Sequence, residues 1–369
     1  MPVPQPTSPL PTPPDGAAQV AHAPSAPLAQ LHPAYFALVM ATGIVSIASH
    51  LVGVPFVPKA LFTLNLLFYP LLWILNLVRL ARYRAQVVAD FSHHGRAVGF
   101  FTVVAATCVL GSQFLLLAAA PEIAFGFWVV GIALYFLLTY SVFTTLMVKE
   151  EKPSLAEGIN GGWLVSVVAA QSVAVLGALL APSIAHTQGV LLFCLVMWLG
   201  GGMLYLWIIS LIFYRYTFFT LAPSDLAPPY WINMGAMAIS TLAGSALVAA
   251  AGRSPVLAQT LPFVRGLTLM WWATATWWIP MLIVLAGWRH LYRKFPFRYD
   301  PLYWGAVFPL GMYAAATVRL SRAIDAPYRF QIPRWFVFVA LSAWLLAFVG
   351  MLRRVSSLLI ANLAVTPRA

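Results

Sequence analysis

Long stretches without any charged residue constrain this chain more than any other feature of its sequence. Nine stretches contain no Asp, Glu, Lys or Arg: 16–58, 60–78, 97–121, 123–148, 158–214, 226–252, 266–288, 301–318 and 335–352. A helix crosses the ~30 Å hydrocarbon core of a bilayer with about 17–25 residues. Charged residues make up only 8% of the chain, against about 25% in soluble domains. We therefore predict an all-α polytopic membrane protein.

Ten transmembrane helices fit these stretches. The stretch 158–214 holds 57 residues, enough for two helices, and the sequence Ala181-Pro182-Ser183 favours a turn between them. The first 32 residues contain nine of the 28 prolines and no Lys or Arg, a composition that predicts disorder. The predicted organisation is a disordered tail (1–32), a ten-helix transmembrane domain (33–355) and a short C-terminal tail (356–369).

The distribution of Lys and Arg predicts the orientation in the membrane. With a cytoplasmic N-terminus, fourteen of these residues fall on the inside and seven on the outside, as the positive-inside rule favours. We expect a multi-pass protein of the plasma (cell inner) membrane with both termini in the cytoplasm.

The odd-numbered and even-numbered spans differ in composition. Gly, Ala, Ser and Thr account for 48 of 101 residues in the odd spans and for 28 of 108 in the even spans. Small residues allow close helix approach in an interior position, while bulky residues face lipid. The odd spans also recur at intervals of 63 to 72 residues, which predicts five helical hairpins with the odd helices inside. Ordinary small-residue packing without a pathway is the alternative.

Several classes of function lack the residues that they need. No Asp, Glu, Lys or Arg lies in the middle of a span, and no HExxH motif or pair of mid-span histidines is present. Cys108 and Cys194 are too few and too far apart for a disulfide scaffold or a cysteine zinc site. The basic residues are scattered rather than gathered as nucleic-acid binding requires. We expect no enzyme activity, cofactor, metal or nucleic-acid partner.

Neutral polar residues remain as candidates on the odd spans. Hydroxyl and amide groups bind a passing anion weakly, as conduction requires. Each such residue alone is more often an interhelical hydrogen bond, and it is their occurrence as a set on the odd spans that favours a pore. The predicted pore-lining residues are Thr42, Thr107, Gln171, Ser240, Thr241 and Thr317.

The ninth span contains the strongest local feature. Pro309 has no backbone N–H, so the carbonyl of Gly305 loses its helical hydrogen bond, and Gly311 makes the backbone just beyond more flexible. We therefore predict a helix kink at Gly305, Pro309 and Gly311. Phe308, beside this break, is a candidate aromatic gate, with a packed or lipid-facing ring as the alternative. Arg96, Arg265 and Arg319 lie at helix ends, where they would attract anions; lipid headgroups are the alternative for such basic clusters.

Four segments in order resemble the tellurite-resistance/dicarboxylate transporter family, which includes slow-type plant anion channels and yeast malate and sulfite transporters. They are Pro33-Ala-Tyr-Phe-Ala-Leu-Val-Met-Ala-Thr-Gly-Ile-Val-Ser, Gly111-Ser-Gln, Trp231-Ile-Asn-Met-Gly-Ala-Met-Ala-Ile-Ser-Thr-Leu-Ala-Gly and Phe308-Pro309. The resemblance implies five hairpins in a pseudo-five-fold arrangement around a central pore. It also implies a homotrimer and a phenylalanine gate, placed here at Phe308.

These observations leave two candidate functions, both of them in anion transport. The first is a channel for small anions or C4-dicarboxylates, driven by the membrane potential. The second is a proton-coupled carrier of C4-dicarboxylates such as malate, or of sulfite, with alternating access. The lipid bilayer, the anion and further copies of the chain are the expected partners. A membrane-embedded enzyme or redox protein is disfavoured.

Overall fold

The computed structural model describes residues 27–324 and 331–365, and these residues form α-helices joined by short 3₁₀ turns, with no strand among them. Residues 1–26, which make up most of the predicted disordered tail, and residues 366–369 lie outside the described part. The α-helices are α1 (Ala37–Leu51), α2 (Val57–Arg82), α3 (Arg84–Phe91), α4 (His94–Ala97), α5 (Thr102–Leu117), α6 (Pro121–Val148), α7 (Leu155–Gly158), α8 (Val165–Leu180), α9 (Thr187–Phe218), α10 (Ile232–Ala249), α11 (Pro255–Gly287), α12 (Trp304–Ala323) and α13 (Gln331–Val365).

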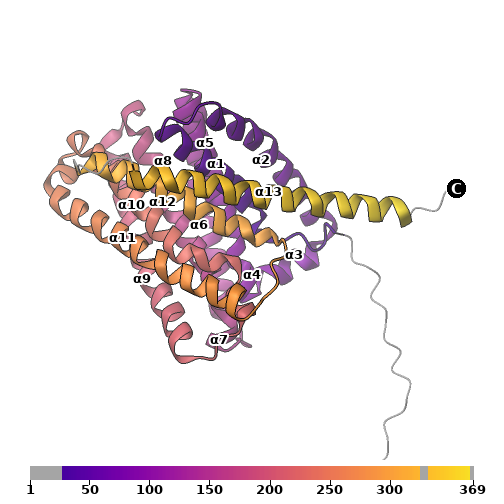
Figure 1. The fold of residues 1–369 in the computed structure, drawn as a ribbon. Coiled ribbons are helices and arrows are strands. Elements are labelled where there is room, and N and C mark those ends of the chain that lie inside the picture. The colour runs from indigo at the N-terminus through magenta and orange to yellow at the C-terminus, as the bar shows by residue number, and fades with distance from the viewer. Residues whose placement is uncertain (1–26, 325–330, 366–369) are drawn as a thin grey trace, which may run out of the picture.

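Five hairpins build the bundle, each made of one inner and one outer helix. The inner helices are α1, α5, α8, α10 and α12, and their hairpin partners are the outer helices α2, α6, α9, α11 and α13 (Figure 1). Each inner helix packs against the next, and α12 packs against α1, so the inner helices form a closed ring. Each outer helix also contacts the inner helix of the following hairpin.

Burial separates the two sets as composition predicts. In α8 and α10, 94% of the most apolar segment is buried inside the protein, against 22% in α6, α11 and α13. Small side chains let the inner helices approach closely, while the bulky side chains of the outer helices remain on the exterior. The prediction of an all-α polytopic membrane protein with the small-residue helices inside is confirmed.

Nine helices in the described part of the chain are long and apolar enough to cross a membrane. The tenth predicted span corresponds to α12, which carries Arg319 and Arg322 in its last turns and is not among the nine. Its residues are buried along most of its length, because α12 is enclosed in the ring. The predicted turn at Ala181–Ser183 is a 3₁₀ turn between α8 and α9. Helix α13 continues to Val365, past the expected domain end at 355, and runs beyond the bundle in Figure 1.

All five inner helices run in the same direction. A short 3₁₀ turn precedes each of them, and each turn contacts the next around a second closed ring. These turns are η1 (Pro33–Phe36), η2 (Val98–Phe101), η3 (Gly161–Leu164), η6 (Pro228–Trp231) and η9 (Pro301–Tyr303). The remaining short segments are the 3₁₀ turns η4 (Ala181–Ser183), η5 (Pro223–Asp225) and η7 (Ala251–Arg253), and the π-helical turn η8 (Trp288–Tyr292).

The same kind of hydrogen bond links every outer helix to the inner helix of the next hairpin. An aromatic side chain on the outer helix reaches a hydroxyl or carbonyl oxygen on the inner helix at 2.8–3.0 Å. The five pairs are Tyr69 with Thr107, Trp128 with the Val173 carbonyl, Trp198 with the Ser240 carbonyl, Trp272 with Thr317, and Trp344 with Thr42. Apart from Tyr69, whose hydroxyl could donate or accept, the donor is an indole N–H. The repeat is therefore visible in side-chain chemistry as well as in packing.

Candidate functional site

A cavity of about 310 Å³ lies where the five inner helices begin. All five 3₁₀ turns contribute to its wall, through Ala34, Gly99, Gly162, Pro229 and Leu302. We call it the helix-start cavity. Helix N-termini carry a partial positive charge and unpaired N–H groups. Five of them surround this cavity, and its wall also carries Arg215 together with the carboxylates of Glu157 and Asp225.

Side chains cap three of these helix starts. His32 Nδ1 accepts a hydrogen bond from the Ala34 N–H at 3.0 Å, Asn160 Oδ1 from Gly162 at 2.8 Å, and Asp300 Oδ1 from Leu302 at 2.7 Å. Burial, together with the nearby charge of Arg96, lowers the pKa of His32 to about 4. The imidazole that lines the cavity is therefore neutral at physiological pH.

One face of α12 connects this cavity with a second one. Gly305, Phe308, Met312, Ala315 and Arg319 follow each other at spacings of three and four residues, so they lie on the same side of the helix. Gly305 lines the helix-start cavity, and Arg319 lines a cavity of about 420 Å³ at the opposite ends of the inner helices. Phe308 lies between these two positions and is 0% exposed.

The predicted kink residues have distinct neighbours. Helix α12 continues through Pro309. Gly311 packs against α1, where an added Cβ would come within 3.0 Å of Val45 Cγ2. Pro309 packs against Gly235 of α10. The small residues beside Phe308 thus bring α12 close to both of its neighbours in the ring.

The polar residues predicted to line the pore make hydrogen bonds inside the bundle. Thr42, Thr107 and Thr317 bond to aromatic side chains of outer helices. The Gln171 amide donates to the Trp198 carbonyl at 3.0 Å. Ser240 and Thr241 bond to carbonyls of their own helix, those of Ala236 and Met237. Buried polar groups need such partners, and five of the six side chains find them here, while the Oε1 atom of Gln171 is buried without a hydrogen-bond partner. The pore-lining role of the six residues stays a prediction.

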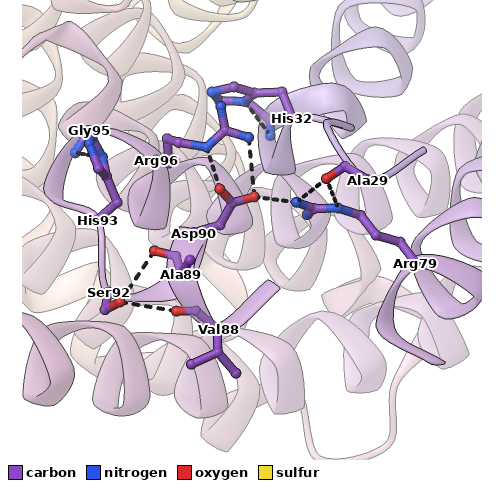
Figure 2. Close-up of polar contacts among 11 residues, drawn as sticks. Ala29, His32, Arg79, Val88, Ala89, Asp90, Ser92, His93, Gly95 and Arg96 are labelled. Carbon is purple, nitrogen blue, oxygen red and sulfur yellow. Dashed lines mark hydrogen bonds and ion pairs between the residues drawn. The ribbon is translucent and has the colours of Figure 1, made fainter. Parts of the chain in front are cut away.

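Of the three predicted anion-attracting arginines, Arg96 is already paired. Figure 2 shows the Asp90 carboxylate between Arg96 and Arg79, with the Arg79–Asp90 contact at 2.6 Å. Arg79 also donates to the Ala29 carbonyl at 3.1 Å. Burial opposes ionisation of Asp90, but the hydrogen bonds from Arg96 and Arg79 outweigh it and hold the pKa of Asp90 below its usual range. The cluster of Arg79, Asp90 and Arg96 therefore links the segment before η1 to the segment between the first two hairpins.

The other two, Arg265 and Arg319, meet in the second cavity. Arg253 and Arg322 lie there with them, and we call it the arginine cavity. The four arginines come from two hairpins, Arg253 and Arg265 from the fourth and Arg319 and Arg322 from the fifth. The charge distribution predicts that they share one side of the membrane, but their convergence in one cavity depends on how the two hairpins pack. Met312 and Ala315 were also missed as neighbours of Phe308, although their spacing from it could have revealed them.

The described residues contain no cluster of His, Cys, Asp or Glu that could hold a metal ion. Cys108 and Cys194 are free and buried, one on an inner helix and one on an outer helix.

A closed ring of inner helices surrounded by membrane-crossing outer helices defines the class of multi-pass α-helical membrane proteins. Over residues 30–352 the chain matches the SLAC1 family, described as voltage-dependent anion channel. The chain belongs to this family, and it is a membrane anion transporter.

Several known proteins are similar to parts or most of this chain. An uncharacterized membrane protein of Mycobacterium tuberculosis is 38% identical over 42% of this chain and 78% of its own length. An uncharacterized transporter of Methanocaldococcus jannaschii is 28% identical over 77% of this chain and 82% of its own. A sulfite efflux pump of Arthroderma benhamiae is 24% identical over 87% and 90%. The membership predicted from four short motifs is confirmed.

Proposed function

We propose that this protein is an anion channel whose pore follows the axis of the inner ring and is closed by Phe308. The observation that carries the proposal is the single face of α12 that begins in one cavity and ends in the other. From Gly305 to Arg319 this face spans about 21 Å of helix, and the fully buried Phe308 ring lies within it.

The electrostatics of both ends suit an anion. Five helix N-termini surround the helix-start cavity, and four arginines line the arginine cavity. No carboxylate lies in the middle of the described spans to trap a proton or a cation. A membrane potential of 100 mV provides about 2.3 kcal/mol per charge, which is sufficient to drive efflux through such a pore.

The substrate we propose is a small anion or a C4-dicarboxylate. Sulfite is the first anion to test, because sulfite efflux pumps are similar to this chain over 87% of its length. We further propose a homotrimer in the plasma (cell inner) membrane with both termini in the cytoplasm. Large apolar side chains such as Leu67, Trp207 and Leu346 are exposed on outer helices, and these faces suit both lipid and neighbouring copies.

Phe308→Ala tests the gate. In proteoliposomes or planar bilayers, loss of the ring should raise anion conductance at least tenfold, because the aromatic obstruction disappears. Phe101→Ala is the matched control. Phe101 is equally buried, but its ring faces Phe143 on the outer helix α6, with centroids 5.8 Å apart. An unchanged conductance in a folded Phe308→Ala protein, or an equal rise in Phe101→Ala, would refute the gate.

A proton-coupled carrier is the second candidate. His32, Glu157 and Asp225 line the helix-start cavity, so titratable groups are present where an anion would enter from the cytoplasm. Malate or sulfite uptake that saturates and follows an imposed pH gradient would favour the carrier. Flux that depends only on the anion gradient and the voltage would favour the channel.

A further inference from the structure

The arginine cavity gathers positive charge from separate parts of the chain. Arg253 follows α10, Arg265 comes from α11, and Arg319 and Arg322 come from the last turns of α12. Small and apolar residues of α8 and α10 complete its wall. None of the described residues that line it is acidic.

Bringing these positive charges together is energetically unfavourable for the folded protein. Like charges in a space of about 420 Å³ repel one another. Within the described part of the chain, Arg253, Arg265 and Arg319 form no salt bridge, since the ion pairs found there involve other arginines. An anion between the guanidinium groups would relieve this repulsion.

The position of the cavity explains why charge is needed there. Helices α8, α10 and α12 all end at its wall, and the C-terminal end of a helix carries a partial negative charge that repels anions. The helix-start cavity has the favourable helix ends and needs no comparable cluster. At the opposite end of the ring, the arginines supply positive charge that opposes the partial negative charge of the helix ends.

The chemistry of arginine narrows the class of ligand. A guanidinium group presents N–H donors in a planar fork that matches two oxygen atoms of one anion. A halide ion offers no such pair of acceptors. Arg319 also shares its helix face with Phe308, so one wall of the cavity continues the face of α12 that we propose to line the pore.

We propose that the arginine cavity is a binding site for soluble oxyanions, of the sulfite, sulfate or carboxylate type, and that it favours them over halides. The proposal rests on the proposed pore for its role in transport, but binding itself can be measured without transport.

The binding test uses the full-length protein in a zwitterionic detergent-lipid mixture and sulfate as the probe. At equal ionic strength, sulfate should raise Tm by several degrees more than chloride does. Arg265→Gln and Arg319→Gln should remove this difference, because loss of one charged fork weakens binding roughly tenfold or more. Arg334→Gln is the matched control, since Arg334 lies at the start of α13 on the same predicted side of the membrane but outside the cavity. It should retain the full difference.

Two further experiments test whether the guanidinium fork is needed for binding and whether the bound anion is a soluble ion or a lipid headgroup. Arg319→Lys keeps the charge and loses the fork, so it should also lose the preference for sulfate; a preserved preference would refute recognition by the fork. Phosphatidylglycerol should not reproduce the effect of sulfate. If this lipid raises Tm by itself and abolishes the sulfate effect, a lipid headgroup fills the cavity and the proposal is wrong. Equal stabilisation of the wild type by sulfate and chloride would also refute it.

Transport measurements separate this proposal from the proposed pore. In a Phe308→Ala background, Arg265→Gln should lower the ratio of sulfate to chloride permeability roughly tenfold while chloride still passes. A Phe308→Ala protein that does not conduct contradicts the gate and leaves the binding result standing. A conducting protein with an unchanged ratio contradicts the oxyanion site alone.

Discussion

The indole N–H of Trp344 donates a 2.9 Å hydrogen bond to the hydroxyl of Thr42, and this contact joins the last helix of the bundle to the first. Both residues are buried, and 302 positions separate them in the sequence. The same device links each of the other outer helices to the next inner helix. The Trp344–Thr42 hydrogen bond joins the fifth hairpin to the first. It therefore closes the ring with the same kind of hydrogen bond that joins the other neighbouring hairpins.

Thr42→Val should destabilise the bundle without altering anion selectivity. The substitution keeps the shape of the side chain but leaves the Trp344 N–H without its partner, at a cost of about 1 kcal/mol. Thermal unfolding in detergent measures the loss. Trp344→Phe should have a similar effect, and the double variant should cost less than the sum of the two. A change in selectivity on Thr42→Val would instead support the predicted pore-lining role.

The sequence was sufficient for the membrane class, the hairpins and the two kinds of helix. Charge-free stretches determine where helices can cross a membrane, and small residues such as those around Gly235 and Gly311 determine which helices can pack closely. The length of a charge-free stretch and its content of small residues belong to each segment by itself. They can therefore be counted in the sequence without knowing which segments pack together.

The roles of individual polar residues could not be predicted in the same way. Thr42 is a suitable pore residue on composition alone, and only the position of Trp344 shows that its hydroxyl already has a partner. Similarly, Arg96 and Arg319 look alike in sequence. One is neutralised by Asp90, and the other lies in the arginine cavity. Such differences depend on contacts between distant segments.

Gly235→Ala should separate α10 from α12. A Cβ at this position would come within 2.7 Å of Pro309 Cγ and 3.3 Å of its Cα. A rigid proline ring cannot move aside without the helix, so we expect a loss of about 1–3 kcal/mol, measured as a fall in Tm. Gly266→Ala is the control, because no atom lies within 4 Å of a Cβ there. It should be neutral or slightly stabilising. Equal effects of the two substitutions would contradict the close packing at Pro309.

Asp90→Asn should destabilise the segment between the first two hairpins. The side chain of Arg79 is only 2% exposed, and removing the partner of a buried charge costs about 3 kcal/mol. Asp225→Asn, which removes the partner of Arg215 in a pair 3.3 Å apart whose carboxylate is 27% exposed, should cost less. Comparable losses of Tm would show that burial of the Asp90 cluster has no special effect.

The same carboxylate predicts acid sensitivity. Because the pKa of Asp90 is lower in the folded protein than its ordinary value of 3.8, its stabilising contribution is complete above about pH 4 and is lost as the pH falls below that value. Wild-type Tm should therefore fall in this range more steeply than that of Asp90→Asn. Parallel curves for the two proteins would exclude Asp90 as the source.

His32 should make stability depend on pH in a higher range. Its pKa is about 4 in the folded protein and 6.5 in an unfolded chain, so between these values the unfolded chain binds more protons and stability rises with pH. The contribution is complete above about pH 6.5 and declines as the pH falls toward 4, because a protonated Nδ1 cannot accept the Ala34 N–H. His32→Asn tests this directly, since the asparagine oxygen can still cap η1 but does not titrate. Thermal unfolding between pH 7.5 and 4 should show a shallower dependence in the variant than in the wild type, with similar Tm at the upper end. A variant that keeps the wild-type slope would show that another group is responsible, and one that is unstable at every pH would show that the imidazole is needed for more than its cap.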